Sequence, residues 1–109
     1  MYKLKKDKYR RARGGKAEVW TIHCAKCNEL VLVYQKDGTG TLKRCYLNRI
    51  LAPAPLEKLQ RDPAIGSVKD LTGLWCPDCQ ALIGSPMLHH EGRLAFRLML
   101  GSWSKKRHG

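Results

Sequence analysis

Two short stretches, "HCAKCNEL" at residues 23–30 and "LWCPDCQALIG" at residues 74–84, each place two residues between a pair of cysteines. A gap of two residues lets a tight turn direct both sulfurs at one ion, and two such turns complete a tetrahedron. We therefore predict one structural metal site formed by four thiolates, those of Cys24, Cys27, Cys76 and Cys79. Because four thiolates leave no open coordination position, this site is expected to stabilise the fold rather than to catalyse a reaction.

The same cysteines allow three other interpretations. Residues 76–79 resemble the Cys-Pro-x-Cys centre of thiol oxidoreductases, but that chemistry needs a helix after the motif, and this stretch ends at Gly84. A closed disulfide framework fits poorly with five cysteines. Iron, as in rubredoxin-like electron carriers, would use the same four sulfurs and remains an alternative to zinc.

Each cysteine pair lies between β-prone stretches, and in this the chain resembles the zinc-ribbon superfamily, whose members close a four-cysteine site between two such knuckles. The resemblance implies one Zn²⁺ ion and covers the body of the chain. Asn28 and Gln80 stand where many knuckles have glycine, and since Gln tolerates a left-handed backbone less well than Asn, we expect a distorted second turn. The 48 residues between Cys27 and Cys76 exceed the usual gap of about 12 to 20, which indicates an insertion or a related but different four-cysteine fold.

The remaining patterns predict a small metal-bound, mostly β, zinc-ribbon-like fold with two hairpins and one short helix. The apolar run at 29–36, the Asp37-Gly38 turn signal and the stretch 41–51 predict the first hairpin. A short helix is expected over 55–62, because Pro55 suits the first turn of a helix.

The second hairpin is expected at residues 87–100, with its turn near Glu91-Gly92. Apolar residues at 94, 96, 98 and 100 alternate with residues that include Arg97, so this arginine is predicted to face solvent.

The positive charge of the chain is concentrated at its ends. The formal net charge is +12 over 109 residues, of which residues 1–16 carry +7, residues 103–109 carry +3 and residues 17–102 only +2. Runs of like charge repel and bury little apolar surface, so we predict a disordered basic arm at 1–16, a zinc-ribbon-like domain at 17–102 and a basic tail at 103–109. Such tails can merely solubilise, or they can bind a polyanion.

These observations predict a zinc-stabilised module that binds the phosphates of RNA or DNA, with ribosomal or other structured RNA favoured by analogy. A protein-interaction zinc module and an iron electron carrier are the alternatives. The candidate phosphate-binding residues are Lys3, Lys5, Lys6, Lys8, Arg10, Arg11, Arg13, Lys16, Lys26, Lys43, Arg44, Arg49, Arg93, Arg97, Lys105, Lys106 and Arg107.

Several function classes are not expected from the sequence. No apolar run approaches the ~18 residues of a membrane-spanning helix, and no apolar region of a secretory signal follows the charged start. We therefore expect a protein of the reducing cytoplasm. The acidic residues of the body are scattered without a pair, so no enzyme activity and no small-molecule substrate are predicted.

The remaining cysteine and the histidines are expected to be structural or exposed. Cys45 is predicted to be a small buried apolar side chain. His23 adjoins a ligand and is expected at the surface or beside the metal site, not on the metal. Alternation along a strand would put His89 and His90 on opposite faces, which makes joint binding of one ion unfavourable.

Overall fold

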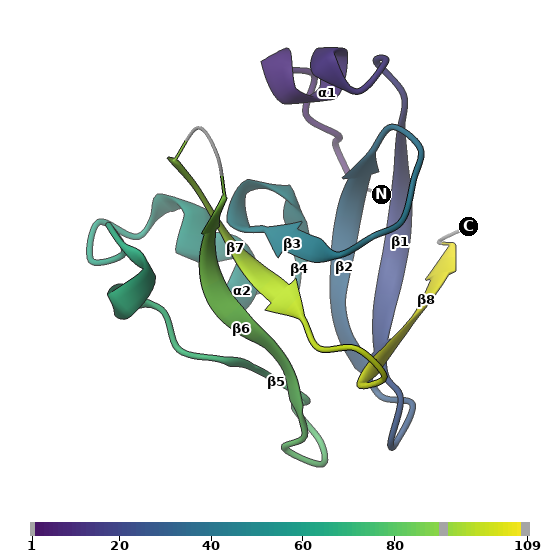
Figure 1. Ribbon diagram of the computed structural model, residues 1–109, viewed down its shortest axis with the longest axis vertical. Coiled ribbons are helices and arrows are strands. Elements are labelled where there is room, and N and C mark those ends of the chain that lie inside the picture. Colours follow the sequence, from purple (N-terminus) through teal and green to yellow (C-terminus); the bar gives the residue numbers. More distant parts are fainter. Residues whose placement is uncertain (1, 90–91, 108–109) are drawn as a thin grey trace.

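Two four-stranded antiparallel sheets make up the fold in the computed structural model, which describes residues 2–89 and 92–107 (Figure 1). The first sheet has the order β4-β2-β1-β8 and the second the order β3-β7-β6-β5. The strands of the first sheet are β1 (Ala17–Cys24), β2 (Leu30–Asp37), β4 (Ile50–Ala52) and β8 (Trp103–Arg107). Those of the second are β3 (Arg44–Tyr46), β5 (Leu74–Trp75), β6 (Leu82–His89) and β7 (Arg93–Leu98).

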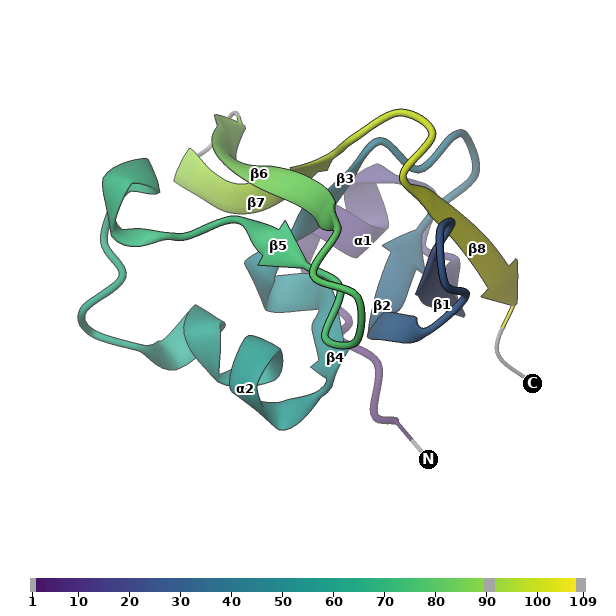
Figure 2. The same cartoon turned by 90° about the horizontal axis from the view of Figure 1, so that it is seen from below.

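One short helix precedes the first strand, and the others lie in the connections from β3 to β5 (Figure 2). The two α-helices are α1 (Lys8–Ala12) and α2 (Ala54–Glu57). The 3-10 helices are η1 (Leu47–Arg49), η2 (Lys58–Arg61) and η3 (Val68–Asp70). None of the helices in the described part of the chain has the length and apolar character needed to cross a lipid bilayer.

One hydrophobic core joins the two sheets. Ile22 and Leu32 of the first sheet are fully buried together with Ile83 and Phe96 of the second. Burial of apolar side chains from both sheets removes their surface from water and stabilises the two sheets as one unit. Cys45 is also fully buried in this core, as predicted, and burial raises the pKa of its thiol.

Two predicted elements are confirmed. The short helix expected at 55–62 is α2 followed by η2, so helical structure covers residues 54–61. The second predicted hairpin is formed by β6 and β7, which pair from Gly84↔Leu98 to His89↔Arg93, and Arg97 is exposed. Glu91 of the predicted turn lies outside the described residues, whereas Gly92 beside it has a φ of 69°.

The first predicted hairpin forms only in part, because Ile50 and Leu51 at the end of its second stretch pair with β2 in β4, whereas residues 44–46 pair elsewhere. After Asp37 the chain leaves the first sheet, and β3 pairs with β7 of the second sheet, with Cys45 opposite Phe96. β2 instead pairs with β1 and β4. The burial of Leu42 and Cys45 accounts for the crossing, because both apolar side chains join the core between the sheets, whereas Lys43 is exposed and Arg44 half-buried.

Both ends of the chain, for which the sequence predicts disorder, contain regular elements in the structure. Trp103–Arg107 form β8, which pairs with β1 from Trp20↔Arg107 to Cys24↔Trp103. At the other end, Asp7 caps α1, and its side chain accepts hydrogen bonds from the backbone amides of Tyr9 and Arg10. A charge run alone does not reveal these contacts, since they depend on partners distant in the sequence.

A buried arginine and a buried glutamine hold the N-terminal arm on the first sheet. Gln35 is fully buried and exchanges two hydrogen bonds with the backbone of Lys5, at 2.7 and 2.9 Å. Arg49 is 1% exposed and donates to Asp7 at 2.5 Å and to Asp37 at 2.7 Å. The hydrogen bond from Arg49 is the main reason that the pKa of Asp7 falls from 3.8 to about 2. The guanidinium of Arg49, one of the predicted phosphate-binding residues, is buried between two carboxylates and does not face solvent.

We expect the Asp7→Asn substitution to lower the free energy of unfolding by about 1–3 kcal/mol, because it leaves the buried Arg49 charge with one carboxylate instead of two. Urea unfolding at neutral pH would measure the change. Asp62→Asn is the matched control: the Asp62 side chain accepts one bond from the Ala64 amide, which an asparagine can also accept. Equal stabilities of the two variants would show that Asp7 does not hold the arm.

Candidate metal centre and basic surface

Four sulfurs converge where the two sheets approach each other at one end of the molecule. Cys24 and Cys27 belong to the turn between β1 and β2, and Cys76 and Cys79 to the turn between β5 and β6, so each sheet supplies one pair (Figure 1). All four Sγ atoms lie within 4.8 Å of one another. The shortest separations are 3.6 Å between Cys24 and Cys79 and 3.4 Å between Cys27 and Cys76. A tetrahedral ion with sulfurs at ~2.3 Å would separate them by ~3.8 Å, so this cluster suits a single ion.

The two cysteine turns have the same backbone hydrogen bonds. In the first turn, Cys24 donates its amide to the Glu29 carbonyl and accepts from the Asn28 amide. The second turn repeats this, with Cys76 donating to Ala81 and accepting from Gln80. The strand register also shifts just before each turn, between residues 22 and 23 and between residues 74 and 75. The two turns are therefore equivalent knuckles on two different sheets.

Each knuckle requires a left-handed backbone directly after its second cysteine. The φ angles are 66° at Asn28 and 65° at Gln80. The distortion that we expected in the second knuckle is absent, since the two angles and the hydrogen bonds agree. Gln80 instead adopts a conformation that is unfavourable for an ordinary side chain.

The surroundings of the sulfurs are unequal. Cys24 and Cys76 are buried, whereas Cys27 is exposed. The backbone amide of Cys27 is the main cause that lowers the pKa of Cys24 to about 7. The Glu29 amide lowers the pKa of Cys27, but desolvation and the bonds to the neighbouring sulfurs together raise it to about 12. The thiols thus share protons, which a divalent cation must displace as it binds.

His23 braces the first knuckle and lies outside the ligand set. Its Nδ1 is hydrogen-bonded to the Asn28 carbonyl at 3.3 Å, and its Nε2 to the Thr21 hydroxyl at 2.9 Å. The first of these bonds stabilises the backbone at Asn28, whose φ is positive. This agrees with the expectation that His23 lies beside the site.

The predicted phosphate-binding residues divide by exposure. Arg49 is buried, and Lys5, Arg10, Arg44 and Arg93 are half-buried. The others are exposed, namely Lys3, Lys6, Lys8, Arg11, Arg13, Lys16, Lys26, Lys43, Arg97, Lys105, Lys106 and Arg107.

Some of these cations already have partners within the chain. Arg107 forms an ion pair with Glu18 at 2.6 Å, and Arg13 donates to the Thr39 carbonyl at 2.9 Å. Arg93 stacks between the rings of Tyr9 and Tyr46. These three are therefore less free to meet an external phosphate than exposure alone suggests.

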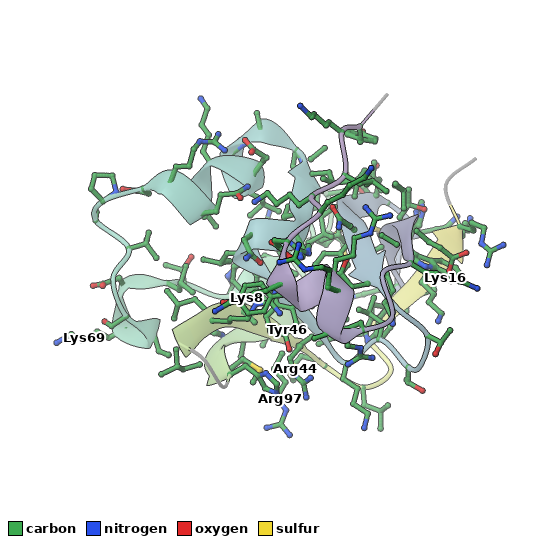
Figure 3. All side chains as sticks on the ribbon, turned by 90° about the horizontal axis from the view of Figure 1, so that it is seen from above. Lys8, Lys16, Arg44, Tyr46, Lys69 and Arg97 are labelled. Atoms are coloured by element: carbon green, nitrogen blue, oxygen red, sulfur yellow. The ribbon has the colours of Figure 1, made fainter. Side chains whose placement is uncertain are left out.

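Arg44 and Arg97 lie directly opposite each other on β3 and β7 (Figure 3). Like charges in directly opposed positions of adjacent strands repel. Across residues 2–89 and 92–107, no carboxylate forms an ion pair with either arginine. The pair is therefore an uncompensated positive site.

The arm adds charge beside Arg44, and the tail adds charge on β8. Burial is the largest cause that lowers the pKa of Lys36 near the end of β2, and the charges of Arg13 and Lys105 lower it further. Arg13, Lys43 and Arg44 line one cavity. We call Arg13, Lys43, Arg44, Arg97 and Lys105 the basic surface.

The sequence did not identify Lys36 as a functional candidate. Lys36 ends an apolar run in which both faces of the strand are buried. A lysine in such a run indicates a candidate site, because an ammonium is seldom buried unless it is paired.

The two adjacent histidines were expected to be structural or exposed. The Nδ1 of His89 forms a 2.9 Å hydrogen bond with the Tyr46 hydroxyl, and His90 lies outside the described residues.

Comparisons with protein-family models, with curated proteins and with solved structures found no match for this chain. The ions that the site can bind therefore have to be inferred from the chemistry of its own residues. Four thiolates are a soft donor set, which suits zinc or iron and disfavours magnesium and calcium. The four cysteines thus form a metal-binding cluster, flanked at a distance by the basic surface.

We expect Cys24→Ser, Cys27→Ser, Cys76→Ser and Cys79→Ser each to weaken metal affinity by more than ~100-fold, because each removes a direct ligand. Metal content per chain, measured by mass spectrometry after dialysis, would test this. Cys45→Ala is the matched control, since Cys45 lies in the core and not in the cluster. Full metal content in any of the four serine variants would exclude a four-sulfur site.

We expect Gln80→Gly to raise the free energy of unfolding by about 0.5–1 kcal/mol, because glycine adopts the left-handed conformation without steric cost. Asp78→Gly in the same knuckle provides the contrast. Its backbone is not left-handed, so the added freedom of glycine in the unfolded chain should destabilise this variant. Urea unfolding of the metal-loaded proteins distinguishes the two signs, and destabilisation by Gln80→Gly would contradict this account of the knuckle.

Proposed function

We propose that this chain is a zinc-ribbon-like module that is stabilised by Zn²⁺ and binds structured RNA or DNA through its phosphates. The observation that carries the proposal is the opposed pair of Arg44 and Arg97, which has no ion-pair partner among the described carboxylates. A phosphate between two guanidinium groups would relieve their repulsion and accept charge-assisted hydrogen bonds from both.

Zinc is favoured over iron because a binding role needs a fixed shape rather than a change of oxidation state. Four thiolates saturate the ion, and its binding energy then contributes to folding. For the same reason we propose a binding protein and not an enzyme. Absorbance of the purified protein separates the two metals, since four-thiolate iron is coloured and zinc is colourless.

The position of the charges supports nucleic acid as the partner. The arm and tail lie on the first sheet, so their cations keep fixed positions beside the basic surface. Binding then requires little ordering of the chain, which would otherwise oppose association. Contacts that are made to phosphates through fixed charges position a polyanion without reading its bases.

We expect the double variant Arg97→Gln/Lys105→Gln to bind nucleic acid more weakly and with a lower salt dependence. The slope of log affinity against log salt should become shallower by roughly 0.7–0.9 for each phosphate contact that is lost. Fluorescence anisotropy with a labelled RNA hairpin and a DNA duplex of the same sequence would measure both quantities and show which is preferred.

The matched control is Lys58→Gln/Lys69→Gln, which removes the same charge from η2 and η3. In Figure 3, Lys69 lies far from Arg44 and Arg97. If the two double variants change the slope equally, net charge alone is responsible and the proposed surface is wrong. Substitutions are preferable to deletion of residues 1–16, because a deletion also removes Asp7 from the buried Arg49.

A further inference from the structure

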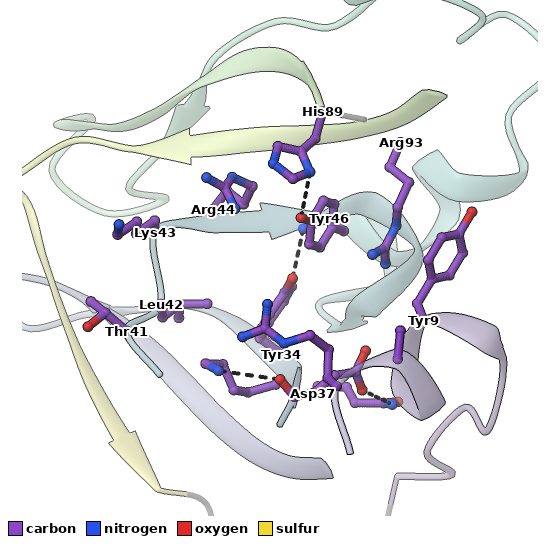
Figure 4. A pocket seen from close by; sticks show the side chains of 14 residues that line it. Tyr9, Tyr34, Asp37, Thr41, Leu42, Lys43, Arg44, Tyr46, His89 and Arg93 are labelled. Carbon is purple, nitrogen blue, oxygen red and sulfur yellow. Dashed lines mark hydrogen bonds between the residues drawn. The ribbon is translucent and has the colours of Figure 1, made fainter. Parts of the chain in front are cut away.

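A cavity of about 390 Å³ opens between α1, the end of β2 and the strands β3 and β7 (Figure 4). Its walls come from parts of the chain that are far apart in sequence: Tyr9 and Arg13 from the arm, Lys36 from β2, Tyr46 from β3 and Arg93 from β7. Its volume lies within the range of ~300–1,000 Å³ that is typical of small-molecule sites. The knuckles lie at the other end of the first sheet, so the cavity is separate from the metal cluster (Figure 1).

The lining of the cavity is strongly cationic. Five of its residues are lysine or arginine, whereas Asp37 is its only carboxylate. The two oxygens of Asp37 are already engaged, one by Arg49 at 2.7 Å and the other by Gln35 at 2.9 Å. The cavity therefore has an excess of positive charge that its own acidic residue does not neutralise.

Lys36 shows this excess most clearly. The residue is 8% exposed, and within the described part of the chain its ammonium donates hydrogen bonds only to the backbone carbonyls of Asp37, Gly38 and Thr39, at 3.3–3.4 Å. Burial, and then the nearby Arg13, lower its pKa. Buried charges are normally paired, and a buried ammonium with only long carbonyl contacts is costly. The carboxylates of Asp37 and Glu18 act in the opposite direction but do not offset these effects, and an anion in the adjoining cavity would add counter-charge.

The opposite wall is aromatic and rigid. The Arg93 guanidinium lies 3.8 Å from the ring centre of Tyr9 and 3.7 Å from that of Tyr46. Tyr46 is fixed by its backbone amide, which donates to the Tyr34 hydroxyl at 2.8 Å, and by the bond between its own hydroxyl and His89. The Nε of Arg93 is buried without a hydrogen-bond partner in the described structure. A planar group would find aromatic surface on this wall.

From these observations we propose that the cavity binds a nucleoside phosphate monoester, with its phosphate near Lys36, Lys43 and Arg44 and its nucleoside along the wall of Tyr9, Arg93 and Tyr46. The monoester can be a free nucleotide or the phosphorylated end of a nucleic-acid strand, since both present the same group. The inference does not depend on the proposed function, because the cavity would bind a free nucleotide even if the basic surface bound no polymer.

Isothermal titration calorimetry of the metal-loaded protein tests the proposal with four probes. Adenosine 5′-monophosphate is expected to bind at least tenfold more tightly than adenosine, and a 5′-phosphorylated RNA oligonucleotide more tightly than its 5′-hydroxyl form. Binding of the phosphorylated oligonucleotide without the free nucleotide identifies a strand end as the ligand, and the reverse identifies a nucleotide. Failure of both phosphorylated probes, or equal affinity for adenosine and its monophosphate, would overturn the proposal.

Substitutions of lining residues test whether the nucleotide binds in this cavity. Lys36→Met keeps the apolar stem and removes the ammonium, and we expect it to reduce nucleotide affinity at least tenfold. Lys43→Gln and Arg44→Gln are at partly or fully exposed positions, so they keep the test decisive if Lys36→Met does not fold. Lys69→Gln is the charge-matched control and should leave nucleotide affinity unchanged. An equal loss of nucleotide affinity in Lys69→Gln would show that net charge alone causes the loss, and would contradict a defined site.

The result can be separated from that for the basic surface. Arg97 and Lys105 do not line the cavity, so Arg97→Gln/Lys105→Gln should retain binding of adenosine 5′-monophosphate. Conversely, Lys36→Met should retain the salt dependence of binding to a 5′-hydroxyl RNA hairpin. Failure of one proposal therefore leaves the other intact.

Discussion

Convergence of four sulfurs is the constraint on which the rest of this structure depends. Each sheet supplies one knuckle, so an ion held by Cys24, Cys27, Cys76 and Cys79 fastens the first sheet to the second. The hydrophobic core runs directly into this cluster, since Cys24 and Cys76 belong to it. In a chain of 109 residues the core alone is modest, and a metal that links the two sheets adds stability without further buried surface.

A second set of stabilising contacts, formed by buried polar side chains, lies on the first sheet away from the sulfurs. There the buried Arg49 joins Asp7 of the arm to Asp37 at the end of β2, and Gln35 holds the arm backbone beside it. The arm thus becomes one wall of the cavity instead of a flexible extension. The four-sulfur cluster lies at one end of the first sheet and the ion pairs of Arg49 lie beside the arm, where the cationic cavity adjoins them.

The sequence predicted what depends on short-range patterns and missed what depends on distant partners. Cysteine spacing, the helix opened by Pro55 and the alternation around Arg97 are local signals, and the structure agrees with each. The destination of the chain after Asp37 is not local, because whether β3 joins β2 or β7 depends on where Leu42 and Cys45 can be buried. The same holds for Arg49: in sequence it resembles the other cations, and only the fold places it between two carboxylates.

The two equivalent knuckles separate the requirements of the metal from those of any ligand. They share hydrogen bonds, a register shift and a left-handed residue, although Ala25, Lys26 and Asn28 of one correspond to Pro77, Asp78 and Gln80 of the other. The two knuckles therefore share their cysteines and their backbone geometry, whereas the residues at the other positions differ. The cationic wall of the cavity, by contrast, is built largely by the segment between the knuckles and by the arm. The long interval between the cysteine pairs is therefore the part of the chain in which a binding site could change while the metal cluster kept the two sheets together.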